Sequence, residues 1–172
     1  QSIQAIYRWK LAGIVTKGGK EREDSVNLGL QVVPPGVKYV LVHDAARPLV
    51  SPGLIQRVLD GAIRSGAVIP VIPVKDTLKV ISNGRVVKTL DRTKMGAVQT
   101  PQGFKLTLLK KAFKKLGHKA ARLTDDASVV EAAGVKVRVV EGDLLNFKVT
   151  SPEDLRHVKD LVWWEKSREY HH

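Results

Sequence analysis

The chain has 172 residues, 43% of them hydrophobic and only 5% aromatic, so it is long enough for one domain with a largely aliphatic core. It contains no cysteine, which excludes disulfides and thiolate metal sites and fits a reducing cytosol, and it has no apolar run of membrane-spanning length. The net charge of +12 favours anionic partners such as nucleic acid, a membrane surface or phosphorylated small molecules.

Apolar runs rich in β-branched residues alternate with helical patterns along the chain. The predicted strands cover 13–17, 39–44, 67–74, 135–142 and 146–150, and the predicted helices cover about 22–33, 52–65, 105–116, 125–133 and 152–167. Short, doubly apolar strands that alternate with helices predict an α/β fold with a mostly parallel sheet covered on both faces.

Capping residues mark the ends of the later helices. "SPEDL" offers Ser151 as N-cap and Pro152 at the first helical position, with acidic residues in the first turn. "LTDDASVVEAAG" offers Thr124 as N-cap and Gly134 as the stop.

Much of the positive charge lies in the predicted helix at 105–116. Its apolar residues recur at helical spacing, and lysines occupy largely the opposite side (Lys110, Lys111, Lys114 and Lys115). This pattern is typical of a solvated face on an amphipathic helix. No aromatic residues interleave with the lysines, which argues against single-strand nucleic-acid binding.

The segment from Asp76 to Arg92 interrupts the alternation. Asn83-Gly84, flanked by alternating apolar residues, is the strongest short-range hairpin pattern. We expect an antiparallel β-arm inserted into the α/β domain. Because an isolated hairpin is marginal in water, the arm should pack on something, such as a second subunit.

Two glycines follow the first apolar run in "GGKEREDSV". The stretch does not fit a phosphate loop, because Gly18 is followed by Gly19 rather than by lysine and a hydroxyl residue. Gly18 and Gly19 could allow a ligand close to the backbone, with Ser25 leading into a helix. An ordinary strand-to-helix turn is the simpler explanation of this stretch taken alone.

The stretch "YVLVHDAARPLV" ends a buried strand with charged residues. In open α/β sheets ligands bind beyond the carboxyl ends of strands, where Asp44 should lie. Its carboxylate could hold a divalent cation, and Arg47 could clamp an anion through its planar fork. The alternative is a local Asp44–Arg47 pair that organises the loop. We expect His43 to be a packed strand-end residue rather than a base.

Other candidates are weaker when taken singly. Thr100 and Thr124 offer hydroxyls, Arg92 lies at the base of the arm, and Lys148 interrupts a strand-like run. The five histidines show no metal-ligand spacing. Composition and pattern therefore indicate a phosphate-binding α/β domain with an arm.

Taken together and in order, these stretches resemble a known family. "GGKEREDSV", "YVLVHDAARP", "VKDTLK", "LDRT", "QTPQGF", "TDDAS" and "VEGDLLNFKVTSPEDL" are similar to motifs of the 2-C-methyl-D-erythritol 4-phosphate cytidylyltransferases, from about Gly13 to Trp163. The resemblance implies a Rossmann-like sugar-nucleotide transferase fold and a homodimer formed through the arm. It also implies transfer of CMP from CTP to methylerythritol phosphate with Mg²⁺ and release of pyrophosphate, in the bacterial cytoplasm, with no membrane or nucleic-acid partner.

The resemblance also implies roles for single residues. Gly19, Lys20 and Ser25 would border the cytosine, Asp44 and Arg47 would face the triphosphate, the metal and the substrate, and Thr100, Thr124 and Thr150 would add hydrogen bonds. Thr77 and Arg92 would reach from the arm into the partner's site. Arg92 and Lys148 would hold the methylerythritol phosphate for attack on the α-phosphorus. This assignment requires Asp44, Lys148 and Arg92 of the partner subunit to share one cavity.

The chain departs from the family pattern at its start. Family members open with a strand and a Leu-Ala-Ala-Gly-x-Gly-x-Arg loop followed by a lysine, and these cations stabilise the transition state. "LAGIVTKGGKER" aligns instead with the later GGxER segment. We therefore expect residues 1–168 to form a single cytidylyltransferase domain without this loop, with arm 76–92, residues 169–172 as a tail and tag remnant, and feeble turnover.

Alternatives remain open. Ribitol-5-phosphate cytidylyltransferases share most of the motifs, and a screen of polyol phosphates with CTP would separate the two. A nucleic-acid-binding or regulatory module would show steeply salt-dependent RNA or DNA binding without CTP binding. A non-catalytic dimerisation module would lose its dimer when the arm is deleted.

Overall fold

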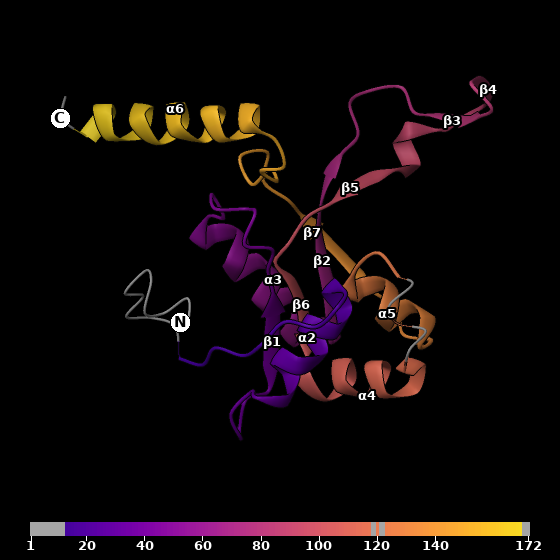
Figure 1. Cartoon of the computed structure of the whole chain (residues 1–172), viewed down its shortest axis with the longest axis vertical. Helices are drawn as coiled ribbons and strands as arrows, with labels where there is room; N and C mark the ends of the chain where they lie inside the picture. The colour runs from indigo at the N-terminus through magenta and orange to yellow at the C-terminus, as the bar shows by residue number, and fades with distance from the viewer. Residues whose placement is uncertain (1–12, 118–119, 121–122, 170–172) are drawn as a thin grey trace.

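The computed structural model describes residues 13–117, 120 and 123–169. In chain order the elements are α2 (Arg22–Gln31), β1 (Tyr39–Val42), α3 (Pro52–Ser65), β2 (Ala67–Pro73), β3 (Lys79–Ser82), β4 (Arg85–Thr89), the 3-10 turn η1 (Arg92–Lys94), β5 (Gly96–Val98), β6 (Gln102–Lys105), α4 (Leu106–Leu116), α5 (Asp126–Ala132), β7 (Arg138–Glu141) and α6 (Pro152–Glu169). They form an α/β body from which the β3–β4 arm and α6 project in different directions (Figure 1).

The central sheet runs in the order β1-β6-β2-β5, and β7 also pairs with β2. β7 is parallel to β2, whereas β6 is antiparallel to both β1 and β2. β1, β2 and β7 therefore point in one direction, as the predicted α/β fold requires, and β5 and β6 run against them. The carboxyl ends of these three strands lie at one edge, where a ligand site is expected.

Two predicted strands are wrong. Residues 13–17 and 146–150 carry β-branched side chains but form no strand. Residues 13–17 are exposed, and the later segment is tied to its neighbour by a bond from Val149 N–H to the Ala46 carbonyl at 2.7 Å rather than by a ladder. β-branched content favours a strand only where a partner strand is available. Conversely, the sequence did not predict β5 and β6, which are short and lie next to polar residues.

Apolar side chains pack on both faces of the sheet. On one face Leu54, Val58 and Ala62 of α3 pack with Val68. On the other face α4 and α5 pack against Ala67, Ile69 and Phe104 together with further aliphatic residues. Successive residues of β2 thus enter opposite clusters, because strand side chains alternate between faces. This burial fixes the strand ends that carry the polar loops.

The helix boundaries follow local capping. Ser51 accepts a hydrogen bond from Leu54 N–H at the start of α3, and Gly66 ends that helix with φ of 81°. Ser151 and Asp154 form reciprocal bonds at the start of α6, as the "SPEDL" pattern predicts. The prediction of Thr124 as the cap of α5 is wrong: Asp125 accepts from Ser128 N–H at 2.9 Å.

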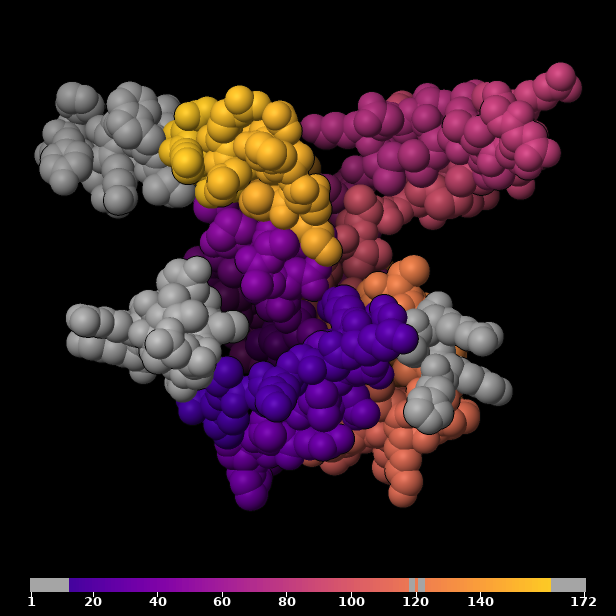
Figure 2. Space-filling model, in the orientation of Figure 1, coloured from indigo at the N-terminus to yellow at the C-terminus, as the bar shows by residue number. Residues whose placement is uncertain are grey.

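The arm is the hairpin predicted from Asn83-Gly84. β3 and β4 pair antiparallel, and the turn residues have positive φ of 49° and 72°. Ile81, Val86 and Val87 of the arm are 67%, 62% and 64% exposed. Figure 2 shows the arm as a ridge that stands away from the body. Large apolar side chains that remain this exposed typically mark an interaction surface.

Within the described residues, none of the helices is both long and apolar enough to cross a bilayer.

Candidate active site

A cavity of about 400 Å³ opens beyond the carboxyl end of β1. Segments that are far apart in the sequence meet there: the start of α2, the loop after β1, the β5–β6 connection, the start of α5 and the loop before α6. Its lining includes Arg22, Asp44, Arg47, Gln99, Thr100, Gln102, Thr124, Asp125, Ser128 and Lys148. This volume is within the range of small-molecule sites.

Asp44 lies between two cations at the centre of this wall. Its Oδ1 accepts a hydrogen bond from Arg22 Nε at 3.3 Å, and its Oδ2 lies 3.1 Å from Lys148 Nζ. Burial disfavours the charged carboxylate, but the hydrogen bond from Lys148 and the charge of Arg22 outweigh it and lower the pKa of Asp44. Asp44 is therefore ionised at neutral pH and is paired with both cations.

Arg22 is held from its other side by Asp126. Arg22 Nη2 lies 2.9 Å from Asp126 Oδ2, and the Asp126 side chain is 0% exposed. Burial raises the pKa of Asp126, and the Arg22 guanidinium offsets part of this effect. Arg22 thus ties the start of α5 to the loop after β1. Sequence reasoning missed Arg22, although it lies within "GGKEREDSV" and could have been noted as the cation that opens α2.

Arg47 stabilises the loop on the other side of Asp44. Its N–H donates to the Asp44 carbonyl at 3.0 Å, and its Nη1 donates to the Asn146 carbonyl at 2.7 Å. Burial lowers the pKa of Arg47 despite the nearby charge of Asp44. The alternative of a local Asp44–Arg47 side-chain pair is wrong, because among the described residues the ion pairs of Asp44 are with Arg22 and Lys148.

A buried amide network holds the floor of the cavity. Asn146 is 0% exposed, and its Nδ2 donates to the Thr100 carbonyl at 2.7 Å. Gln99 is 2% exposed and bonds the backbone of Asp143 from both ends of its amide, at 2.8 and 3.0 Å. These bonds fix the loop that carries Lys148 against the β5–β6 connection. Neither amide was among the candidates predicted from the sequence.

The opposite wall comes from the start of α5. Gln102 of β6 donates to Asp125 Oδ2 at 2.6 Å and accepts from Ala127 N–H at 3.0 Å. These bonds connect the helix to the sheet. Thr124, which was predicted to bind substrate, lines the cavity next to Asp125.

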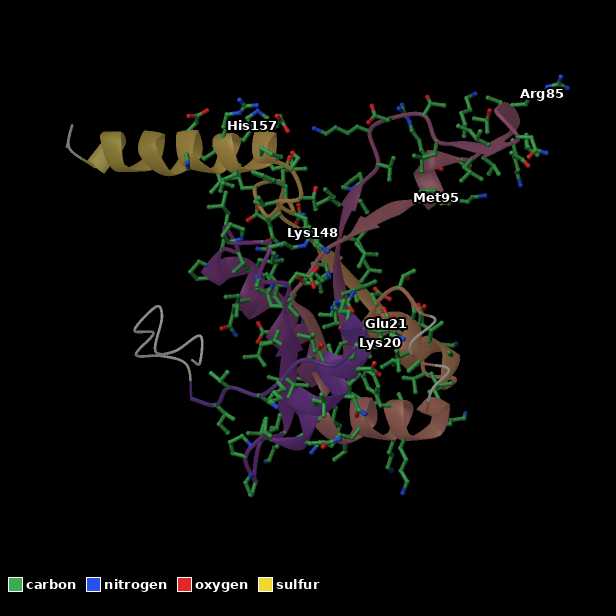
Figure 3. The ribbon with its side chains drawn as sticks, viewed as in Figure 1. Lys20, Glu21, Arg85, Met95, Lys148 and His157 are labelled. Carbon is green, nitrogen blue, oxygen red and sulfur yellow. The ribbon has the colours of Figure 1, made fainter. Side chains whose placement is uncertain are left out.

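The predicted cytosine-binding segment adjoins the cavity through Arg22. Gly19 N–H donates to Ser25 Oγ at 2.9 Å, and Ser25 Oγ donates to the Glu21 carbonyl. A Cβ on Gly19 would lie 2.2 Å from the Asp24 Cβ, so only glycine fits this turn. Figure 3 shows Lys20 and Glu21 side by side, below Lys148 in this view. Lys20 is exposed and does not line the cavity.

The arm residues lie elsewhere in the same chain. Arg92 donates to the Lys75 carbonyl and lines a separate hollow of about 500 Å³ with residues of β2 and β7. Thr77 is exposed, and Thr150 donates to Asp154 as part of the α6 cap. Within one chain the structure thus brings together Asp44, Arg47, Thr100, Thr124 and Lys148, and it does not place Thr77, Arg92 or Thr150 beside them.

Comparison with known proteins identifies the family. Residues 3–162 match the family described as IspD: 2-C-methyl-D-erythritol 4-phosphate cytidylyltransferase. The chain belongs to this family. The 2-C-methyl-D-erythritol 4-phosphate cytidylyltransferase of Bacillus mycoides is 52% identical over 150 residues, which cover 87% of this chain and 66% of that protein. A Bacillus cereus relative is 51% identical over 139 residues, which cover 81% of this chain and 61% of its own length.

Solved structures show the same fold. The crystal structure of 2-C-methyl-D-erythritol 4-phosphate cytidylyltransferase from Thermus thermophilus has a TM-score of 0.82 and 41% identity, covering 90% of this chain and 75% of that one. The predicted α/β fold with its antiparallel arm is therefore confirmed. The chain spans just under two thirds of the length of the Bacillus relatives.

Proposed function

We propose that the protein transfers CMP from CTP to 2-C-methyl-D-erythritol 4-phosphate and releases pyrophosphate, as a cytoplasmic enzyme of isoprenoid synthesis. The single observation that supports this most directly is Asp44, held 3.1 Å from Lys148 and 3.3 Å from Arg22 in a cavity at the carboxyl end of β1. Such a cluster suits a reaction between two phosphates, where a protein mainly positions groups and neutralises charge.

In this proposal Lys148, together with Arg92 of the partner subunit, holds the phosphate of the acceptor substrate, and Arg47 lies in the wall of the same cavity. An oxygen of that phosphate attacks the α-phosphorus of CTP, and the bond to the pyrophosphate leaving group breaks. Lys148 is 46% exposed, so its ammonium can leave Asp44 and move to the phosphate without exposing a buried charge. Gly19 and Ser25 border the cytosine, while Thr100 and Thr124 provide hydrogen bonds. Thr150, which was expected to add a hydrogen bond, caps α6 through Asp154 and does not line this cavity.

Asp44 fits a role in holding Mg²⁺. Among the described residues no group of three or more histidine, cysteine or acidic side chains could bind a metal alone. An ionised carboxylate such as Asp44 therefore needs the phosphate oxygens of a bound nucleotide to complete a magnesium ligand set. When bound, Mg²⁺ would neutralise charge on the triphosphate.

We propose further that residues 76–92 act as a dimerisation arm of a single domain, and that Thr77 and Arg92 serve the site of the partner subunit. The exposed Ile81, Val86 and Val87 support an arm that is covered in the assembly. Arg92 lines a separate hollow of its own chain rather than the candidate active-site cavity, which supports a role in the other subunit.

Mixed dimers test both proposals. Arg92→Ala and Lys148→Ala should each raise KM for the acceptor phosphate and lower turnover, while CTP binding survives. Mixing the two impaired variants should raise the activity to roughly a quarter of the wild-type value where each variant alone falls well below it, because half of randomly assorted dimers are mixed and each then holds one intact site. No recovery would contradict the shared site, and wild-type kinetics in both variants would refute the assignment. A comparison of 2-C-methyl-D-erythritol 4-phosphate with ribitol 5-phosphate, each assayed with CTP, identifies the acceptor substrate.

A further inference from the structure

His43 connects two segments of the cavity through both of its ring nitrogens. His43 Nε2 lies 3.0 Å from the Arg47 carbonyl oxygen, and His43 Nδ1 lies 3.0 Å from Thr100 Oγ1. The side chain is exposed, so the prediction of a packed strand-end residue is wrong. Because each nitrogen already has a partner, His43 is also poorly placed to act as a base.

The carbonyl of Arg47 decides which nitrogen carries the proton. A carbonyl oxygen only accepts hydrogen bonds, so His43 Nε2 must be the donor. In a neutral imidazole the other nitrogen is then an acceptor. Thr100 Oγ1 therefore donates its single hydroxyl proton to His43 Nδ1.

The hydrogen bonds that the Thr100 hydroxyl already makes determine which further bond it can form. One of its two lone pairs accepts the Asp44 N–H at 3.0 Å. Since its proton is given to His43, only one lone pair remains, and Thr100 is part of the cavity wall. Thr100 can thus accept a hydrogen bond from a ligand but cannot donate one. Phosphate oxygens are acceptors and form no hydrogen bond with this lone pair, whereas a hydroxyl group of a ligand can donate to it.

We propose that His43 is a positioning residue that sets the Thr100 hydroxyl as an acceptor, so that a hydroxyl group of the polyol substrate is bound at Thr100 while its phosphate is bound at Lys148. The inference rests on the proposed function for the identity of the substrate. The polarity of Thr100 does not depend on the substrate: it follows from the hydrogen bonds of this chain with a neutral His43 ring.

Nitrogen NMR of the histidine side chains tests the polarity directly. Two-bond proton–nitrogen spectra of the labelled chain distinguish a protonated Nε2 from a protonated Nδ1, and the spectrum of His43→Gln assigns the signal of His43. At pH 8, where histidine side chains are ordinarily neutral, we expect the Nε2-protonated form for His43. In Thr100→Val the Nδ1 signal should move, because the hydroxyl bond is lost. A predominantly Nδ1-protonated ring would overturn the inference.

Two amide substitutions at His43 separate its two bonds. Asparagine places an amide oxygen where Nδ1 lies and can still accept from Thr100, whereas glutamine places an amide nitrogen where Nε2 lies and keeps only the bond to Arg47. His43→Gln should weaken binding of 2-C-methyl-D-erythritol 4-phosphate about fivefold, the effect of one net hydrogen bond, while His43→Asn changes it less than about twofold. CTP binding, measured separately by calorimetry, should be unchanged in both.

A double-mutant cycle supplies the last control. If His43 acts through the Thr100 hydroxyl, Thr100→Val should add little to His43→Gln, whereas Thr100→Ser, which keeps the hydroxyl, should bind the polyol phosphate more tightly than Thr100→Val. Equal losses in His43→Asn and His43→Gln, or additive losses in the cycle, would refute the role. A wild-type chain that binds neither CTP nor the polyol phosphate would instead refute the proposed function, and the NMR result would still decide the polarity of Thr100.

Discussion

The Arg22–Asp126 pair offers the sharpest test of the site's electrostatics. We consider Arg22→Met, which keeps the length of the side chain and removes its charge. Asp126 is 0% exposed and accepts from Arg22 at 2.9 Å, and its Oδ1 has no hydrogen-bond partner among the described residues. Asp44 keeps Lys148 in this variant, so Asp126 is the group that loses its counter-charge.

The loss of folding stability caused by Arg22→Met has an upper bound. A buried carboxylate without a partner takes up a proton rather than remain charged. In the unfolded chain an aspartate has an ordinary pKa near 3.9. Protonating that carboxylate at pH 7 therefore costs about 4 kcal/mol, at 1.36 kcal/mol per pH unit. Removal of one partner of a buried pair typically costs about 3–5 kcal/mol. We therefore expect Arg22→Met to lower the free energy of unfolding by about 3–4 kcal/mol at pH 7.

The pH dependence of this cost has a definite sign. Burial raises the pKa of Asp126 in the folded protein, and loss of Arg22 raises it further. Between the unfolded pKa and this raised value, the folded variant binds a proton that the unfolded chain does not. Its stability is therefore greatest below about pH 4 and falls as pH rises, by up to about 1.4 kcal/mol per unit. The difference from wild type should nearly vanish near pH 4.

Urea unfolding followed by circular dichroism at 222 nm, from pH 4 to 8, measures these quantities. Arg156→Met is the matched control, since it breaks an exposed ion pair with Glu153 and should cost less than about 1 kcal/mol at every pH. Arg22→Met in an Asp126→Asn background should lose the pH dependence. A cost of Arg22→Met that is constant from pH 4 to 8 would refute this reasoning.

Further predictions concern the cavity floor, the core and a helix end. Asn146→Ala removes the bond to the Thr100 carbonyl and should lower the free energy of unfolding by about 2 kcal/mol, with a matching shift in the urea midpoint; an unshifted midpoint would contradict the buried network. Phe104→Ala, at a fully buried position of β6, should cost about 3–5 kcal/mol with an unchanged urea m-value. Gly66→Ala should cost about 1–2 kcal/mol, because φ is 81° while the added Cβ would meet Leu108 only at an ordinary 3.5 Å. Gly29→Ala in α2 has no such φ and should stabilise the protein instead, so an equal effect of the two glycine changes would refute the backbone argument.

Local patterns in the sequence predicted some elements closely. α3 begins and ends at the predicted 52 and 65, because Ser51, Pro52 and Gly66 define its ends through bonds between near neighbours. The arm follows equally from Asn83-Gly84, whose positive φ values select a tight turn. Both features depend on residues only a few positions apart.

The strands of the sheet were harder to predict, because each one pairs with a segment that is distant in the sequence. Residues 13–17 and 146–150 have strand-like composition but no partner strand, so they remain irregular. β6 carries Gln102 and Gly103 and looks unlike a central strand, yet it lies between β1 and β2. Strand formation depends on which partner is available, and composition does not report this.

The sequence by itself determined the family, through the order of its motifs, and with it the residues Asp44, Thr100, Thr124 and Lys148 that meet in one cavity. Only the tertiary structure decided that Arg22 joins Asp44 to Asp126, a residue 104 positions away, and that His43 lies between Arg47 and Thr100. The physical reason is distance along the chain. Caps and turns are formed by neighbours, whereas charge states and hydroxyl orientation depend on groups that become neighbours only after folding.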